Sequence, residues 1–125
     1  MSRYLLKITG GTLRGRSLSE KGNSRIRPTS ARVREAIFNM LREKIIGANV
    51  LDIYAGTGCL SLESLSRGAK QVTLVEKDET ALTLIKKNFF DTQLSSRYTL
   101  IKGSSPNALD SLKGPYDLIF ADPPY

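Results

Sequence analysis

The sequence contains no histidine and only one cysteine, and this scarcity excludes several kinds of chemistry. A zinc site takes most of its ligands from these two residue types, so we predict no metal centre. Cys59 has no second cysteine for an internal disulfide, which fits the reducing cytoplasm. It also has no histidine that would activate its thiol as a nucleophile.

Long apolar runs are also missing. No segment approaches the ~20 apolar residues that cross a bilayer, and the N-terminus lacks the apolar core of a signal peptide. The 125 residues are 40% hydrophobic and 25% charged, which is typical of one soluble globular domain. We therefore predict a cytoplasmic protein that has no membrane partner.

Acidic residues are scarce in the first third of the chain. Residues 1–46 hold eleven Lys and Arg against three Asp and Glu, a net charge of +8, whereas residues 47–125 hold eight against nine, a net charge of −1. We divide the chain here into a basic N-terminal extension and an α/β core. Such asymmetry indicates a polyanionic partner at one end of the molecule. A solvated basic face is the alternative, and composition does not separate the two.

Hydrophobic periodicity and turn residues predict a hairpin, a helix and then alternating strands and helices. The hairpin spans residues 4–18, and the first helix is capped by Thr29 or Ser30 and extends to about Lys44. The apolar residues of this helix that we expect to face the core are Val33, Ile37, Met40 and Leu41. The later elements are strands at 50–53, 71–76, 98–102 and 117–121, with three helices between them. The first of these helices spans 60–67, the second is capped by Asp78, and the third spans 105–112. This order predicts an α/β fold with a doubly wound, mostly parallel, Rossmann-like sheet.

The turn after the first of these strands lacks the features of two common phosphate-binding loops. No lysine follows Gly58, which excludes a P-loop, and Ser61 stands where a dinucleotide fingerprint needs its third glycine. Gly56 and Gly58 still allow the backbone to turn tightly and to approach a ligand. Asp52, near the end of the buried strand, would repel a pyrophosphate. It suits a cationic ligand such as the ammonium and sulfonium of S-adenosylmethionine.

A second acid, Glu76, closes the next strand, eighteen residues after Gly58. An acid about 20 residues beyond a glycine turn is placed to accept hydrogen bonds from ribose hydroxyls. A structural turn with two incidental acids is the alternative. The two acids together favour a nucleoside ligand, and S-adenosylmethionine is the cofactor that we predict.

The last strand delivers Asp122-Pro123-Pro124-Tyr125 to the same edge of the sheet. An exocyclic base amine is a poor nucleophile, because its lone pair is delocalised into the ring. Asp122 and the carbonyl of Pro123 would accept its hydrogens and orient it, while the prolines keep the loop rigid. Tyr125 would stack on the base, an interaction worth ~1–3 kcal/mol. The alternative is an ordinary strand-to-loop turn.

Five arginines of the basic extension are candidate contacts to nucleic-acid phosphates. Arg14 and Arg16 flank a glycine in the predicted hairpin, on a stretch that we expect to be exposed. Arg32 and Arg34 lie in the first turns of the first helix, where cations oppose the helix dipole, so stability alone would not favour them. Arg27 lies just ahead of that helix. We therefore predict that these five residues contact the phosphates of a nucleic acid, which is RNA if the family resemblance described next holds.

These motifs carry a family resemblance. Asp52 to Gly58, Glu76 and the terminal tetrapeptide resemble the motifs of class I S-adenosylmethionine-dependent methyltransferases that act on amino nitrogens. The stretches 8–16 and 27–39 narrow the resemblance to the bacterial 16S ribosomal RNA guanine-N2 methyltransferases, the RsmD type, over essentially the whole chain. The single motifs are widespread, but their combination and spacing are specific.

The resemblance also implies which residues form the site. The residues that would contact the cofactor are Asp52, Gly56 and Gly58 at its methionine end, Glu76 at its ribose, and Ser104 or Ser105 near its adenine. Thr29 lies in the segment 28–34, whose polar groups would face the methionine carboxylate. Asp122, Pro123 and Tyr125 would hold the guanine amine and ring.

The activity that the resemblance implies is methyl transfer from S-adenosylmethionine to the exocyclic N2 amine of a guanine in 16S ribosomal RNA, in one direct step without a metal. The partner would be ribosomal RNA or the small ribosomal subunit, and the complete enzyme would be a monomer. Family members continue past the tetrapeptide with three more strands, so we expect the core to be incomplete after Tyr125. The alternatives are an RNA-binding fragment without activity and a DNA adenine-N6 methyltransferase, which shares the tetrapeptide.

Overall fold

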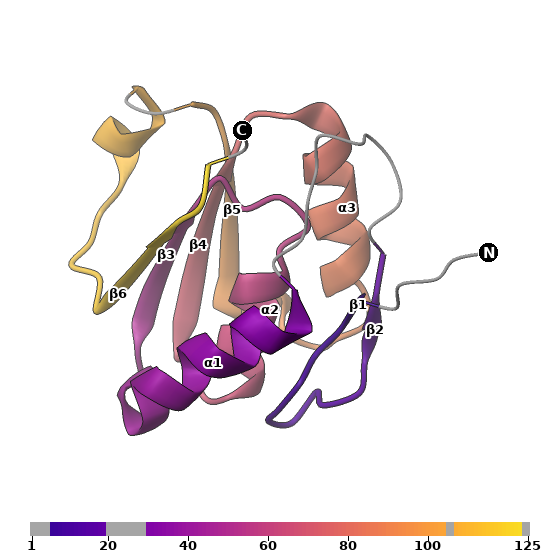
Figure 1. The fold of residues 1–125 in the computed structure, drawn as a ribbon. Helices are drawn as coiled ribbons and strands as arrows, with labels where there is room; N and C mark the ends of the chain where they lie inside the picture. The colour runs from indigo at the N-terminus through magenta and orange to yellow at the C-terminus, as the bar shows by residue number, and fades with distance from the viewer. Residues whose placement is uncertain (1–5, 20–29, 105–106, 124–125) are drawn as a thin grey trace.

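The central sheet is parallel, as the sequence predicts (Figure 1). The computed structural model describes residues 6–19, 30–104 and 107–123. Within them, four strands pair in the order β5-β4-β3-β6, and every pair is parallel. Their bounds are Asn49–Ile53 for β3, Gln71–Glu76 for β4, Tyr98–Lys102 for β5 and Leu118–Ala121 for β6. The α/β prediction is confirmed, and β4 and β5 have the predicted bounds.

The helices follow the predicted order with two differences. The α-helices of the described residues are α1 at Ala31–Leu41, α2 at Cys59–Ser66 and α3 at Glu79–Phe89. The 3-10 helices are η1 at Arg42–Ile45, η2 at Ser95–Arg97 and η3 at Asn107–Ser111. The first helix therefore changes to 3-10 geometry after Leu41, and the described part of the helix predicted at 105–112 is also 3-10.

Two predicted helix caps are present. The Ser30 hydroxyl accepts a hydrogen bond from the Val33 amide at 3.2 Å at the start of α1. The Asp78 carboxylate accepts one from the Ala81 amide at 2.9 Å at the start of α3. Each bond satisfies a backbone donor that the first helical turn leaves without a partner.

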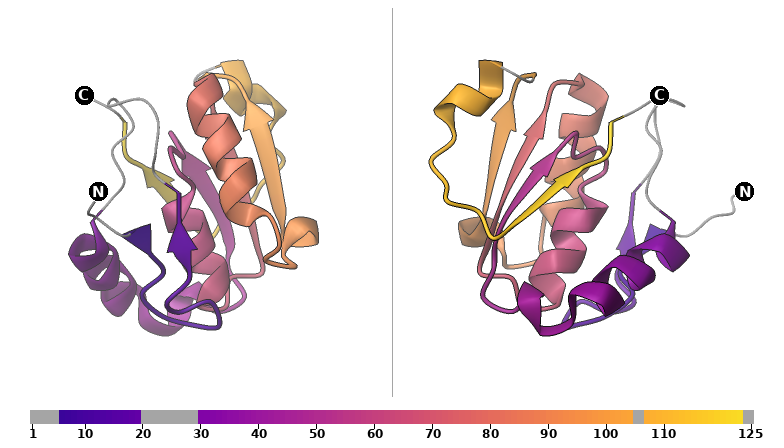
Figure 2. Two further views of the ribbon diagram at one scale, coloured as in Figure 1. Left: turned by 90° about the vertical axis from the view of Figure 1, so that its right-hand side faces the viewer. Right: turned by 60° about the vertical axis from the view of Figure 1, so that its left-hand side comes forward.

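The α-helices lie on one side of the sheet (Figures 1 and 2). Val50, Val72 and Leu74 point to this side and are fully buried, as are Leu62 of α2 and Ile85 of α3. The chain passes from β3 to β4 and β5 on one side, and then returns to place β6 against the other edge of β3. In open parallel sheets such a reversal leaves a crevice at the carboxyl ends of the strands, where ligands bind.

The N-terminal hairpin is a separate two-stranded sheet. Strand β1, Leu6–Lys7, pairs antiparallel with β2, Ser17–Leu18. Its connecting loop lies against the end of α2, and a side chain at Gly11, whose φ is +81°, would meet the Ser66 carbonyl oxygen at 1.9 Å. Glycine is therefore required there both by its backbone conformation and by this close approach.

Glu63 of α2 joins the hairpin loop to two helices. The side chain of Glu63 is fully buried. Its two oxygens accept hydrogen bonds from the Thr9 amide at 3.0 Å, the Gly10 amide at 2.9 Å and the Thr9 hydroxyl at 2.9 Å. They also form ion pairs with Arg34 of α1 at 2.9 Å and with Arg67 at 2.7 Å. One carboxylate thus holds three segments that are distant in the sequence.

The predicted buried face of α1 is confirmed for Ile37 and Leu41, which pack against the core, and is wrong for Val33 and Met40. Val33 is 48% exposed and Met40 is 80% exposed, whereas Arg34 and Phe38 are buried. Arg34 and Phe38 are four residues apart and therefore share one helix face. The ion pair between Arg34 and Glu63 turns that face toward α2, which an apolar pattern alone does not reveal. Of the four predicted core residues, those that are partly buried are Ile37 and Leu41.

Residues 1–46 and 47–125, which the sequence analysis divides into a basic extension and an α/β core, share one hydrophobic core. Leu6, Ile8 and Phe38 from residues 1–46 belong to the same buried cluster as the residues of β3 and α2. The division of the chain at residue 46 stays a prediction.

We predict that Glu63→Gln lowers the free energy of unfolding by about 3–5 kcal/mol, because it removes the negative charge that balances a buried arginine. The measurement is urea unfolding followed by circular dichroism. Glu79→Gln is the matched control, since Glu79 forms an ion pair with Lys102 in which both side chains are more than half exposed. An exposed pair of this kind contributes about 0–1 kcal/mol. Equal losses for the two variants would contradict the role given to Glu63.

Candidate functional site

Three carboxylates come together at the carboxyl edge of the sheet. Asp52 lies on the central strand β3, where it pairs with Leu74 of β4 and Phe120 of β6. Glu76 ends β4 and Asp122 follows β6, each two residues beyond its strand's pairing position with Asp52. Both acids act electrostatically on Asp52. The fold therefore places the three predicted acids at the ends of three adjacent strands, on the same edge of the sheet.

Asp52 is a buried acid whose ionisation falls near neutral pH. Asp52 is 2% exposed. The pKa of Asp52 is raised to about 7: burial is the main cause, the hydrogen bond from Ser61 lowers the pKa, and the charges of Glu76 and Asp122 raise it. A cation beside Asp52 would favour its ionised form. The site is thus suited to a positively charged ligand group.

Glu76 supports the glycine turn. One of its oxygens accepts a hydrogen bond from the Gly56 amide at 2.9 Å. The other accepts from the amides of Lys77 at 3.2 Å and Asp78 at 3.0 Å. A carboxylate has about four acceptor positions, so these three bonds leave room for a ligand hydroxyl. This structural role was not predicted from the sequence.

The two glycines of the turn are needed for different reasons. Gly58 has a φ of +81°, and a side chain there would meet Phe89 at 3.3 Å and Ile85 at 3.4 Å. Gly56 has a φ of +60°, but among the described residues a side chain there would have only the Tyr54 carbonyl oxygen within 4.0 Å. The open side of Gly56 leaves space for a ligand against the backbone, whereas Gly58 allows α3 to pack closely.

Tyr54 is a site residue that sequence reasoning missed. Its φ is +64°, a conformation that costs a residue with a side chain about 1–2 kcal/mol. Its amide donates to the Val75 carbonyl at 3.0 Å, and its side chain is 40% exposed beside the turn. No signal in the sequence distinguishes this tyrosine, because the strain arises from the turn geometry.

The remaining predicted site residues are placed as follows. Asp122 is exposed and Pro123 is half-buried, directly after β6. Ser104 is exposed, two residues beyond the end of β5, and its carbonyl accepts from the Ala108 amide at 2.8 Å. Four predicted residues lie outside the described part of the chain: Arg27, Thr29, Ser105 and Tyr125.

Arg34 was wrongly predicted to bind RNA. Its side chain is 0% exposed, and its guanidinium donates to Glu63 at 2.9 Å and to the Lys7 carbonyl at 2.7 Å. Arg14 and Arg32 are exposed, as expected. Arg16 is half-buried, with one guanidinium nitrogen donating to the Phe90 carbonyl at 2.7 Å. The phosphate contacts that we predicted for Arg14, Arg16 and Arg32 stay predictions.

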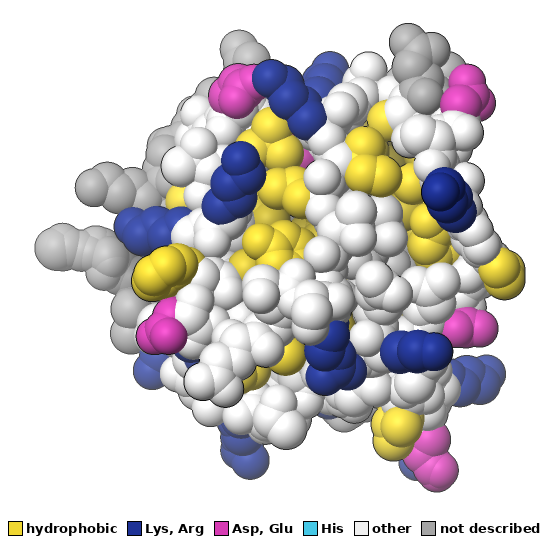
Figure 3. All heavy atoms as spheres, turned by 180° about the vertical axis from the view of Figure 1, so that it is seen from behind, with side chains coloured by type: hydrophobic (Ala, Val, Ile, Leu, Met, Phe, Trp, Pro, Cys, Tyr) yellow, Lys and Arg dark blue, Asp and Glu magenta, His cyan; other side chains and the backbone are white. Residues whose placement is uncertain are grey.

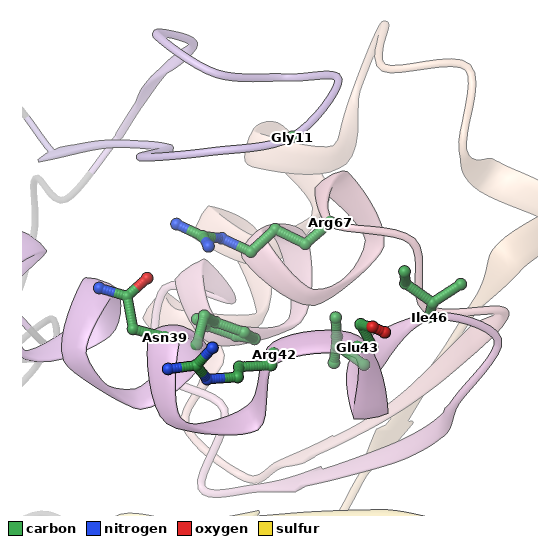
Figure 4. Close-up of a pocket in the computed structure, with 8 residues that line it drawn as sticks. Gly11, Asn39, Arg42, Glu43, Ile46 and Arg67 are labelled. Atoms are coloured by element: carbon green, nitrogen blue, oxygen red, sulfur yellow. The ribbon is translucent and has the colours of Figure 1, made fainter.

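A groove of about 740 Å³ lies away from the carboxylates (Figure 4). Figure 4 shows Arg67, at the end of α2, opposite Asn39 of α1 and Arg42 of η1. These residues come just before β3 and β4 begin, so the groove lies near the amino ends of the strands. It is therefore separate from the carboxylate site.

The face of the sheet opposite the α-helices is partly open. Figure 3 shows hydrophobic side chains between lysines and arginines on the back of the molecule. A hollow of about 430 Å³ is lined there by Thr73, Thr99 and Ile101 of the sheet together with Leu112. Ile119 of β6 is 59% exposed.

Two features are absent from the part of the chain that the structure describes. No helix in this part of the chain is long and apolar enough to cross a membrane. No three of its His, Cys, Asp and Glu residues are grouped so that they would hold a metal ion.

Curated relatives of this chain are named as ribosomal RNA methyltransferases. The chain is 39% identical, over 125 residues, to ribosomal RNA small subunit methyltransferase D of Haemophilus influenzae, covering 96% of this chain and 64% of that protein. It is 37% identical to the Escherichia coli protein of the same name over 120 residues, covering 96% of this chain and 60% of that protein. The chain thus spans less than two thirds of the length of these relatives.

The fold and the sequence agree on the family. A solved structure of the Escherichia coli protein yhhF, a candidate methyltransferase, superimposes with a TM-score of 0.84 at 36% identity, over 98% of this chain and 65% of that chain. The family described as conserved hypothetical protein 95 matches residues 6–125. The chain therefore belongs to this family, and the family resemblance predicted from its motifs is confirmed.

Proposed function

We propose that this chain serves S-adenosylmethionine-dependent methylation of the exocyclic N2 amine of a guanine in 16S ribosomal RNA. The observation that carries the proposal is the meeting of Asp52, Glu76 and Asp122 beside the glycine turn. The names of the curated relatives support ribosomal RNA as the substrate. The choice of guanine N2 follows from the sequence resemblance alone.

The cofactor site is formed by residues whose chemistry fits S-adenosylmethionine. The buried carboxylate of Asp52 faces the cationic end of the ligand, and the open side of Gly56 receives its methionine part. Glu76 accepts hydrogen bonds from three backbone amides, and its remaining acceptor position takes a hydrogen bond from a ribose hydroxyl. Ser104, two residues beyond the end of β5, is the proposed contact to the adenine. When bound, the cofactor supplies an electrophilic methyl group on a sulfonium.

Asp122 and Pro123 act on the target amine. The Asp122 carboxylate and the Pro123 carbonyl accept hydrogen bonds from the two N–H groups of the amine. These bonds turn the nitrogen lone pair toward the methyl group. The exposed position of Asp122 directly after β6 leaves it accessible to a base. Tyr125, which lies outside the described residues, completes the predicted base contact. We further propose that the protein acts in the cytoplasm, as a monomer and without a metal ion.

The first test concerns the cofactor. We expect Glu76→Gln to weaken S-adenosylmethionine binding by about 1.5–3 kcal/mol, since it replaces hydrogen bonds to a charged acceptor. Isothermal titration calorimetry measures the affinity, and Glu79→Gln, on the exposed start of α3, serves as the control. Binding of NADH but not S-adenosylmethionine by the unchanged chain would refute the cofactor assignment.

The second test separates transfer from cofactor binding. We expect Asp122→Asn to lower methyl transfer to 16S ribosomal RNA by a factor of about 10²–10³, because a charged acceptor is replaced by a neutral amide, whose oxygen accepts more weakly and whose NH₂ group is a donor. Cofactor affinity should not fall, because removing this charge lowers the pKa of Asp52 and favours its ionised form. The assay follows a labelled methyl group, with Asp110→Asn on η3 as the control. Near-normal transfer by Asp122→Asn would remove this residue from the proposed mechanism.

The third test concerns the basic extension. We expect Arg14→Ala combined with Arg32→Ala to flatten the dependence of log RNA affinity on log salt by about 1–2, because each phosphate contact contributes ~0.7–0.9 to that slope. Lys86→Ala combined with Lys87→Ala removes the same charge from exposed positions on α3 and should leave the slope unchanged. Equal slopes for both double variants would assign the arginines to a solvated basic face.

A further inference from the structure

Ser61 lies beside the candidate cofactor site without facing solvent. It belongs to the first half of α2 and is fully buried. Its hydroxyl donates a hydrogen bond of 2.7 Å to the Asp52 carboxylate, which is also buried. In dinucleotide-binding loops this position holds a glycine, whose role is close packing of helix and strand. Here the same position supplies a hydrogen-bond donor instead.

The surroundings of Asp52 otherwise oppose its ionised form. Burial disfavours the charge, and the charged groups that act on Asp52 within the described residues are two further carboxylates, Glu76 of β4 and Asp122 after β6. Like charges and desolvation both favour the neutral acid. Within the same residues, the interaction that favours the carboxylate is the hydrogen bond from Ser61.

We propose that Ser61 is a positioning residue of the cofactor site, whose hydroxyl keeps the Asp52 carboxylate ionised and oriented toward the cationic end of the ligand. The inference rests on the proposed function, because that cationic end is the ammonium of S-adenosylmethionine. Ser61 itself does not touch the ligand. It acts through one oxygen of Asp52, and the other oxygen is left for the ligand.

The direction of the pH effect follows from this arrangement. A cation binds the ionised form of Asp52, so this contribution to affinity is present above the pKa of Asp52, about 7, and is lost as the pH falls below it. Without the Ser61 hydroxyl the carboxylate loses a stabilising donor, and its pKa rises. The affinity at neutral pH then falls, because less of the protein holds Asp52 in its ionised form.

The first arm of the test needs no cofactor. The carboxyl ¹³C signal of Asp52 is followed by NMR against pH in the unchanged chain, in Ser61→Ala and in Ser64→Ala. Ser64 is the matched control, because it is a fully buried serine of the same helix whose hydroxyl donates to the Leu60 carbonyl at 2.8 Å. We expect the Asp52 midpoint to rise by about one pH unit in Ser61→Ala, an effect typical of a lost hydrogen bond to a charged group, and to stay in place in Ser64→Ala.

The second arm measures S-adenosylmethionine binding by calorimetry at several pH values. At pH 7 we expect Ser61→Ala to bind about fivefold more weakly than the unchanged chain, because a midpoint raised from about 7 to about 8 lowers the ionised fraction of Asp52 from about one half to about one tenth. The ratio of the two dissociation constants should approach one as the pH rises above both midpoints. The ammonium of the ligand also titrates, but it does so equally for both proteins and cancels in the ratio. In an Asp52→Asn background, Ser61→Ala should have no further effect.

Several outcomes would overturn the proposal. It fails if Ser61→Ala and Ser64→Ala shift the Asp52 midpoint equally, or if the midpoint rises while cofactor affinity at pH 7 is unchanged. If Ser61→Ala does not fold, Ser61→Cys keeps a weaker donor and should give a smaller rise of the midpoint. Absence of S-adenosylmethionine binding by the unchanged chain at every pH would instead count against the proposed function, since the NMR arm reports on Ser61 independently.

Discussion

The buried carboxylate of Glu63 is the constraint on which the N-terminal half depends. Its oxygens bind two arginine side chains and the loop of the hairpin, with donor-to-oxygen distances between 2.7 and 3.2 Å. A charge taken out of water at this depth is tolerated only when it is fully paired. The hairpin, α1 and α2 therefore take up one mutual arrangement, and that arrangement decides which side of α1 meets solvent.

The charges at the carboxyl edge of the sheet are not balanced in this way. Burial is the main factor that opposes the ionisation of Asp52, and the charges of Glu76 and Asp122 add to it. Selection for stability alone would not favour three acids at the ends of adjacent strands. The three acids lie close together because β3, which carries Asp52, lies between β4 and β6. A cationic ligand would relieve the repulsion, so the site is most stable when it is filled.

Sequence reasoning predicted the framework better than the contacts within it. The bounds of β4 and the cap at Asp78 were predictable, because an apolar run and a capping residue are local signals. The buried face of α1 was not, since Arg34 occupies a core position that an apolar pattern assigns to solvent. The amide bonds of Glu76 and the strained backbone of Tyr54 depend on how the turn folds over the next strand, which no single stretch of sequence encodes.

The pairing of β3 with β6 has a consequence for folding. Their first contacts join Asn49 to Asp117, 68 positions apart in the chain, whereas β3 and β4 are linked through one short helix. Closing so long a loop is entropically costly, and non-local pairings of this kind slow folding. Asp122 reaches Asp52 only through this pairing. We therefore expect these two acids to meet late in folding, after the glycine turn and its helix have formed.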